Sequence, residues 1–138
     1  MIKIENLSKV CRTEEVETKA LNSIALEVKQ GEFITIMGAS GCGKSTLLNI
    51  VGLLDSASSG SYQLLGQEML GLSESEKSKI RKQNIGFIFQ NFNLIDELSV
   101  YDNIELPLIY NNVPSSERKK KVEAIAERLA ISHRLKHF

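Results

Sequence analysis

A glycine-rich segment early in the chain restricts the fold more than any other feature. Residues 38–45 read Gly-Ala-Ser-Gly-Cys-Gly-Lys-Ser, which matches the phosphate-loop pattern G-x-x-x-x-G-K-[ST]. The almost wholly apolar segment Phe33–Met37 precedes it, and Ser45–Leu54 follows with helical spacing of its apolar residues. The order strand, glycine loop, helix predicts an α/β fold in which Phe33–Met37 is a strand buried on both faces of a parallel sheet.

The residue types of this loop suit the binding of a nucleoside triphosphate. Backbone N–H groups surround a dense anion only where the chain turns tightly, which glycines permit, and the helix that follows attracts anions at its N-terminus. We expect Lys44 to reach the β- and γ-phosphates, Ser45 to help hold Mg²⁺, and Thr46 to lie near the α-phosphate. The complete predicted nucleotide-binding loop is Gly38, Ala39, Ser40, Gly41, Cys42, Gly43, Lys44, Ser45 and Thr46.

Composition excludes several classes of protein. The chain has 138 residues, with 17 Lys and Arg against 17 Asp and Glu, whereas a dedicated nucleic-acid binder is usually basic overall. No apolar run approaches the roughly 18 residues of a membrane span, and the N-terminus has no long apolar core typical of a secretory signal. The two cysteines, Cys11 and Cys42, argue against a disulfide framework and favour a reducing cytoplasm.

The remaining pattern predicts a β layer followed by helices. Alternation of apolar and polar residues predicts strands over residues 2–7 and 20–28, with polar loops over 10–19 and 56–61, a short strand at Tyr62–Leu65 and a buried strand at Ile85–Phe89. Ser73 and Glu76 form a capping box that starts a helix reaching about Lys82. Another helix begins near Glu117, and Pro107 limits any helix within residues 91–112.

Three polar features have competing interpretations. Two apolar segments end in acids, at Asp55 and at Asp96-Glu97, as a metal-binding strand of a nucleotide site does. We interpret both as unrelated, because Asp55 follows the far end of the loop helix and Asn93 interrupts the other run. The basic residues of the last helix favour a solvated face over a contact surface for acidic lipid or nucleic acid; they are Arg118, Lys119, Lys120, Lys121 and Arg128.

Several segments beyond the loop resemble the ATPases of ATP-binding-cassette (ABC) transporters over essentially the whole chain, and most of all the branch that drives lipoprotein release and macrolide-type export. They are GASGCGKST at 38–46, Leu53-Leu54-Asp55 followed by Ser59-Gly60, Arg81 ahead of Ile85-Gly86-Phe87-Ile88-Phe89-Gln90, Phe92-Asn93-Leu94, and Asp102-Asn103-Ile104-Glu105-Leu106-Pro107-Leu108. The resemblance implies a truncated P-loop ATPase core with an antiparallel β layer and the start of a helical subdomain. It divides the chain into a nucleotide-binding core at 1–90 and a helical part at 91–138.

The resemblance also implies roles for individual residues. Gln90 matches the family's Q-loop glutamine, a catalytic residue whose side-chain carbonyl reaches Mg²⁺ or the attacking water. The segment Asn91–Leu98 matches the place where these ATPases receive a membrane subunit, the permease. Cys11 stands where the family usually has an aromatic residue that stacks on adenine. A thiol packs against a ring face without offering a π-surface, so we expect weaker binding of the base than of the phosphates.

The expected partners are therefore the permease and a second ATPase subunit in a head-to-tail dimer, and no nucleic acid. The expected location is the cytoplasmic side of the inner or plasma membrane, and the expected cofactors are ATP and Mg²⁺. The family continues into a Leu-Ser-Gly-Gly-Gln segment, a metal-binding strand with a catalytic Glu, and a switch His, none of which occurs in these 138 residues. We therefore expect this chain to bind nucleotide without turnover. Two alternatives stay open, a non-catalytic nucleotide-binding remnant and another P-loop enzyme. A GTPase would show Asn-Lys-x-Asp, which is absent, and a small-molecule kinase would carry an arginine-rich lid.

Overall fold

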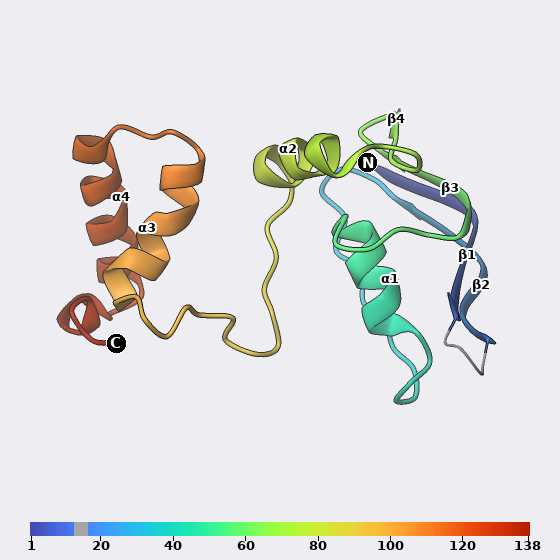
Figure 1. Cartoon of the computed structure of the whole chain (residues 1–138), viewed down its shortest axis with the longest axis horizontal. Helices are drawn as coiled ribbons and strands as arrows, with labels where there is room; N and C mark the ends of the chain where they lie inside the picture. The colour runs from blue at the N-terminus through green and yellow to red at the C-terminus, as the bar shows by residue number, and fades with distance from the viewer. Residues whose placement is uncertain (13–16) are drawn as a thin grey trace. The chain divides into compact units, whose positions relative to one another are not determined.

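The structure, a computed structural model, describes residues 1–12 and 17–138. The chain forms two compact units, residues 1–87 and 88–138. The first contains a β-sheet, the glycine loop and two helices, and the second contains the remaining helices (Figure 1). Among the residues that the structure describes, no helix is both long and apolar enough to cross a lipid bilayer.

The sheet of the first unit has four strands, each antiparallel to its neighbours, in the order β2-β1-β3-β4. They are β1 (Ile2–Arg12), β2 (Glu17–Val28), β3 (Ser59–Leu64) and β4 (Gln67–Glu68). This sheet is the antiparallel layer that the sequence predicts. The predicted loop over residues 10–19 is wrong at 10–12 and 17–19, which pair as strands, while 13–16 lie outside the described residues. Ladder hydrogen bonds join backbone groups, so exposed polar residues can extend a strand beyond its apolar part.

Helix α1 (Lys44–Val51) covers the sheet through two buried side chains, Leu47 and Ile50. They join a core cluster that also contains Ile4, Leu7, Leu21, Leu53, Tyr62 and Met69. The Tyr62 hydroxyl donates a hydrogen bond of 2.8 Å to the carbonyl of Val51, and burial raises the pKa of Tyr62 to about 12. Strand β3 and the end of α1 are therefore tied together inside the core.

The two predicted parallel strands are not formed within the described residues. Residues 33–37 and 85–89 have irregular backbone and belong to neither edge of the sheet. Phe33 is 93% exposed and Ile88 is 98% exposed, although Ile36 and Ile85 pack against the core cluster. An apolar, β-branched composition indicates that a segment is suited to burial. To form a strand, the segment also needs a neighbouring strand whose backbone hydrogen-bonds to its own.

Helix α2 (Glu74–Asn84) closes the first unit and begins as predicted. The Ser73 hydroxyl accepts a hydrogen bond from the backbone N–H of Glu76, and the Glu76 carboxylate accepts one from the backbone N–H of Ser73. The hydrogen bond from the Ser73 hydroxyl lowers the pKa of Glu76 below its usual range. The capping box is therefore confirmed in both directions.

The second unit contains α3 (Val100–Tyr110), α4 (Ser115–Arg128) and the short 3-10 helix η1 (Ser132–Arg134). The prediction that Pro107 limits a helix there is wrong, because α3 passes through it. Val122 and Ala126 of α4 are buried. The Arg118 guanidinium bonds the Glu105 carboxylate of α3 and the carbonyl of Val113, each at 2.8 Å, so it fastens the two helices together.

The basic face of α4 is partly neutralised from within the helix. Lys121 pairs with Glu117 at 2.7 Å, and Lys119 approaches Glu123 at 3.9 Å. With Arg118 bonded to Glu105, three of the five basic side chains have an acidic partner. The interpretation of this face as solvated stays a prediction.

Candidate nucleotide-binding site

The glycine loop joins the sheet to α1 and is shaped by its own glycines. Gly41 and Gly43 have φ values of +78° and +93°, a region that residues with a side chain rarely adopt. A Cβ at Gly43 would also overlap the carbonyl oxygen of Ala20, on β2. The loop therefore needs glycine at position 43 for two separate reasons, and its backbone lies against β2.

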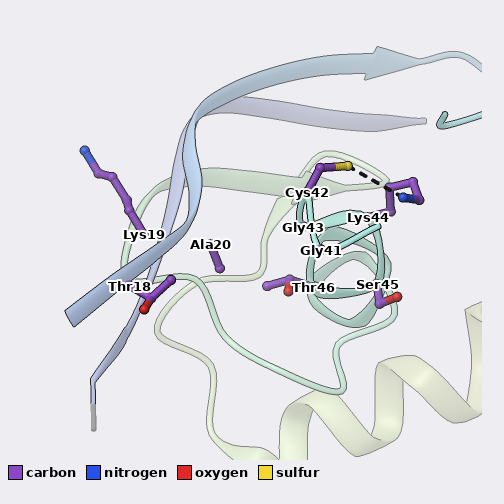
Figure 2. Close-up of a pocket in the computed structure, with 9 residues that line it drawn as sticks. All are labelled: Thr18, Lys19, Ala20, Gly41, Cys42, Gly43, Lys44, Ser45 and Thr46. Atoms are coloured by element: carbon purple, nitrogen blue, oxygen red, sulfur yellow. Dashed lines mark hydrogen bonds between the residues drawn. The ribbon is translucent and has the colours of Figure 1, made fainter. Parts of the chain in front are cut away.

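Lys44, the first residue of α1, is enclosed by the loop that precedes it. Its Nζ donates hydrogen bonds to the carbonyls of Gly38 and Ala39, at 2.8 and 2.7 Å, and lies 3.6 Å from the Cys42 sulfur. Figure 2 shows the Lys44 and Cys42 side chains joined in this way beside the start of α1. The loop thus folds around a fixed ammonium group.

A cavity of about 320 Å³ lies between this loop and β2. From the loop and α1 it is lined by Gly41, Cys42, Gly43, Lys44, Ser45 and Thr46, and from β2 by Thr18, Lys19 and Ala20 (Figure 2). The first N–H groups of any α-helix have no partner within the helix, so the start of α1 presents donors here. Backbone donors, two lysines and three hydroxyl side chains around one cavity suit a phosphate chain.

The three residues from β2 are the part of the site that the sequence analysis missed. It assigned Thr18 and Lys19 to a loop, whereas both belong to β2 and line the cavity. The β-branched Thr18 is a good strand former, which is the signal that could have extended the predicted strand backwards. Cys11 is exposed on β1 directly opposite Thr18. Residues opposed in an antiparallel pair lie on one face, so Cys11 is a cross-strand neighbour of the cavity wall.

The other predicted residues lie as follows. Gly38 and Ala39 hold Lys44, Ser45 is exposed and Thr46 half-buried at the start of α1, and Ser40 is exposed in the loop. Gln90 is exposed in irregular backbone of the second unit. No group of three or more His, Cys, Asp or Glu side chains suited to a metal occurs in the described ranges.

The end of α1 opposite the glycine loop has an unusual termination. The N–H groups of Leu53 and Leu54 bond the carbonyls of Ile50 and Asn49, at 3.0 and 2.8 Å, which is the Schellman pattern. Glycine normally occupies the left-handed position of this motif, but here it is Leu53, with φ +57°. A leucine in that conformation costs about 1–2 kcal/mol. Its side chain is only 3% exposed, so burial in the core offsets the backbone strain.

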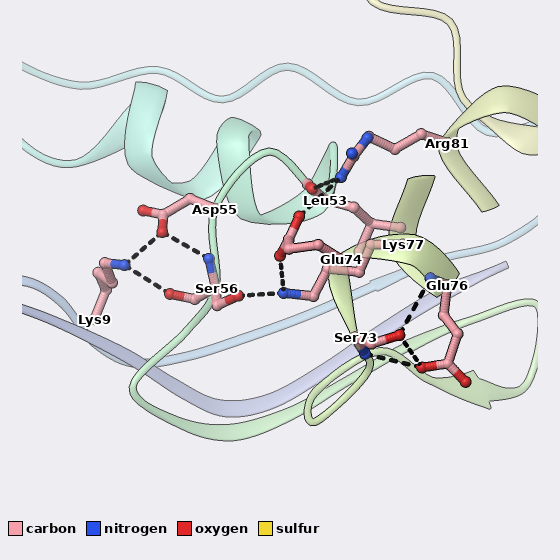
Figure 3. Close-up of polar contacts among 9 residues, drawn as sticks. All are labelled: Lys9, Leu53, Asp55, Ser56, Ser73, Glu74, Glu76, Lys77 and Arg81. Atoms are coloured by element: carbon pink, nitrogen blue, oxygen red, sulfur yellow. Dashed lines mark hydrogen bonds and ion pairs between the residues drawn. The ribbon is translucent and has the colours of Figure 1, made fainter. Parts of the chain in front are cut away.

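Cations from two other elements hold the segment that follows (Figure 3). Lys9 of β1 donates to the Asp55 carboxylate at 2.6 Å and to the carbonyl of Ser56 at 2.7 Å. Lys77 of α2, which is 7% exposed, bonds the Ser56 hydroxyl and the Glu74 carboxylate. Asp55 is thus engaged in an ion pair with Lys9 of β1.

The Lys9–Asp55 pair predicts a pH dependence of stability. The hydrogen bond from Lys9 lowers the pKa of Asp55 below its ordinary value of 3.8. Because the folded-state pKa is the lower one, the stabilisation is complete above the unfolded-state pKa and is lost as the pH falls through the folded-state pKa. Asp55→Asn should therefore lower the melting temperature at neutral pH, and the difference from wild type should shrink below about pH 4. Melting curves between about pH 3 and 8 measure this, with Asp96→Asn as the control; a difference independent of pH would contradict it.

A glycine loop wrapped on a lysine, followed by a helix over an antiparallel sheet, defines a P-loop nucleotide-binding protein. The sequence model of the family described as "ABC transporter" matches residues 21–138. The chain belongs to the ABC transporter ATP-binding family.

Its relatives carry the same cassette within longer chains. The chain is 38% identical to the macrolide export ATP-binding/permease protein MacB of Azoarcus sp. (strain BH72), covering 99% of this chain and 21% of that protein. It is 41% identical to the uncharacterized ABC transporter ATP-binding protein MJ1508 of Methanocaldococcus jannaschii, covering 100% of this chain and 62% of that one. The chain therefore spans less than two thirds of these curated relatives.

A solved structure confirms the α/β class. The ATP-binding cassette MJ0796, solved as a dimer in a post-hydrolysis state bound to ADP and Pi, matches with a TM-score of 0.90 and 38% identity, covering 99% of this chain and 60% of that one. A second dimeric structure of the same cassette matches with a TM-score of 0.82. The described fold is thus that of a part of an ABC ATPase cassette.

Proposed function

We propose that this chain is the nucleotide-binding portion of an ATPase subunit that energises an ABC exporter at the cytoplasmic face of a membrane. The observation that carries the proposal is the cavity between β2 and the glycine loop, which Lys44, Ser45 and Thr46 help to line. In it, backbone donors and Lys44 bind the β- and γ-phosphates of ATP, and the Ser45 hydroxyl supplies one ligand to Mg²⁺. When bound, Mg²⁺ neutralises charge on the phosphate oxygens.

The proposed nucleotide would displace contacts that Lys44 makes within the loop. Its ammonium is bonded to two neutral carbonyls, whereas a phosphate oxygen offers a charged acceptor and a stronger hydrogen bond. The lysine therefore exchanges loop carbonyls for phosphate without leaving its place at the start of α1. We assign Gln90 to the family's water- and Mg²⁺-contacting role as part of the same proposal.

We further assign the permease contact to Asn91–Leu98 of the second unit. This segment exposes apolar side chains, with Phe92 92% and Leu94 59% exposed. The Asn103 side chain holds the segment by accepting from the N–H of Ile95 and donating to the carbonyls of Ile95, Leu98 and Ser99. An apolar surface on an ordered loop favours docking, because less conformational entropy is lost on binding. The second cassette of a head-to-tail dimer completes the proposed assembly, as the dimeric cassette structures suggest.

Calorimetric titration of the chain tests nucleotide binding directly. MgATP and inorganic triphosphate should both bind, because the contacts of the loop are to phosphate, and AMP should bind far more weakly. Absence of triphosphate binding would contradict the assignment of the loop.

Cys11→Tyr should tighten MgATP binding three- to tenfold without changing triphosphate binding, since stacking contributes about 0.5–1.5 kcal/mol. An unchanged ATP affinity in Cys11→Tyr would contradict the placement of adenine beside β1.

A further inference from the structure

We infer that Arg81 of α2 is a positioning residue for the nucleotide-binding loop, acting through the far end of α1. The inference deepens the proposed function and rests on it, because the quantity that Arg81 governs is nucleotide affinity. It is carried by one contact: the Arg81 guanidinium donates to the carbonyl of Leu53 (Figure 3). Leu53 is the left-handed residue that ends the helix carrying Lys44.

A strained backbone persists only where surrounding groups determine it. Two groups do so at Leu53, namely the burial of its side chain and the hydrogen bond from Arg81 to its carbonyl. Glu74 lies 3.8 Å from the same guanidinium nitrogen, so the arginine is itself oriented from within α2. Loss of Arg81 leaves the side chain of Leu53 in place but frees its carbonyl and the turn that terminates α1.

A displacement at the C-terminal end of α1 also affects its N-terminal end, because the helix is short. It has eight residues, or about 12 Å of length, so its two ends are only about two turns apart. Leu47 and Ile50 pack on the sheet from one side of it, and the Arg81 contact sets its position along its own axis. A shift along that axis displaces Lys44 and Ser45 relative to the β2 wall of the cavity, at Thr18 and Ala20.

The variant that tests this is Arg81→Met, which keeps the length of the side chain and removes its donors. MgATP affinity measured by calorimetry well below the melting temperature should fall about five- to tenfold, corresponding to about 1–1.4 kcal/mol. Arg81→Lys, which retains a donor, should recover part of the loss. Equal affinities of wild type and Arg81→Met would overturn the inference, whereas failure of wild type to bind would overturn the proposed function instead.

Arg118→Met is the matched control. Arg118 also bonds a glutamate and the carbonyl of a residue that follows a helix, Val113, but in the second unit. Its replacement should lower the melting temperature without changing MgATP affinity. If Arg118→Met reduces affinity as much as Arg81→Met does, the effect of Arg81 is general destabilisation and the inference fails.

A measurement on wild type keeps the inference testable if Arg81→Met does not fold. Coupling between two sites is reciprocal. If the C-terminal end of α1 affects the loop, MgATP bound at the loop should slow hydrogen exchange in peptides covering residues 52–56 and 79–84. Peptides covering the turn between β3 and β4, at residues 64–68, should be unaffected. Protection confined to residues 38–47 would show that the far end of α1 is not coupled to the site, and would overturn the inference.

Discussion

Lys44→Ala should reduce MgATP affinity by about a hundredfold or more. A hydrogen bond from a charged group contributes about 1.5–3 kcal/mol, and Lys44 is placed to make more than one to the phosphates. Its ammonium lies among the loop carbonyls and at the wall of the cavity. The fold should change little, because Lys44 takes no part in the core cluster. Calorimetry and circular dichroism on the same preparation measure both properties.

Lys29→Ala serves as the control for Lys44→Ala. It removes a lysine of the first unit that lies beyond the end of β2, and its affinity should equal that of wild type. Equal affinities for all three proteins would mean that the lysine of the loop does not contact phosphate, and the assignment of the site would fail with it.

Gly43→Ala should impair both folding and nucleotide binding. Alanine at φ +93° costs about 1–2 kcal/mol, and its Cβ would overlap the Ala20 carbonyl, which is backbone and yields little. Overpacking adds about 1–3 kcal/mol, so the free energy of unfolding should fall by about 2–5 kcal/mol. Relief of the overlap requires the loop to move away from β2, which opens the cavity and weakens MgATP binding.

Gly31→Ala separates the two causes. Gly31 has a similar φ of +82° and nothing within 4 Å of a Cβ, so it should lose only the backbone contribution of about 1–2 kcal/mol and should bind MgATP normally. Chemical denaturation of both variants measures the difference. Equal losses of stability in the two would contradict the close approach of the loop to β2.

The parts of the fold that could be predicted from the sequence are those determined by residues close together in the chain. The glycine loop, the helix after it and the capping box at Ser73 depend on local backbone chemistry, and each occurs where its residues indicate. The start of α3 has a second capping box, formed by Ser99 and Asp102, which the sequence analysis did not include; it held only that Pro107 limits a helix in this region. The helix continues past Pro107, whose carbonyl accepts hydrogen bonds from both the N–H and the side-chain amide of Asn111.

The parts that could not be predicted depend on residues far apart in sequence. The cavity wall at Thr18–Ala20 exists because β2 passes the loop, and no local pattern encodes that approach. Arg81 is part of a segment that resembles the family, but its bond to a carbonyl 28 positions earlier depends on the tertiary structure and is encoded by no local pattern. The wrong prediction at Phe33–Met37 has the same cause. Its apolar composition predicted a strand, but the segment has no neighbouring strand with which to pair in the described residues.

The central place of β1 in the sheet also sets the order in which the site can form during synthesis. Of the four strands of this sheet, β1 is made before the others. It pairs with β2 on one edge, but its other edge stays unpaired until β3, which begins at Ser59, has been made. An isolated helix of eight residues is unstable in water, and α1 lies between those two strands in the chain. The Tyr62 bond to Val51 that ties α1 to the sheet forms only after β3 is made. During synthesis the chain should therefore become able to bind nucleotide only once Tyr62 has left the ribosomal tunnel, after residues 38–46 of the glycine loop have already emerged.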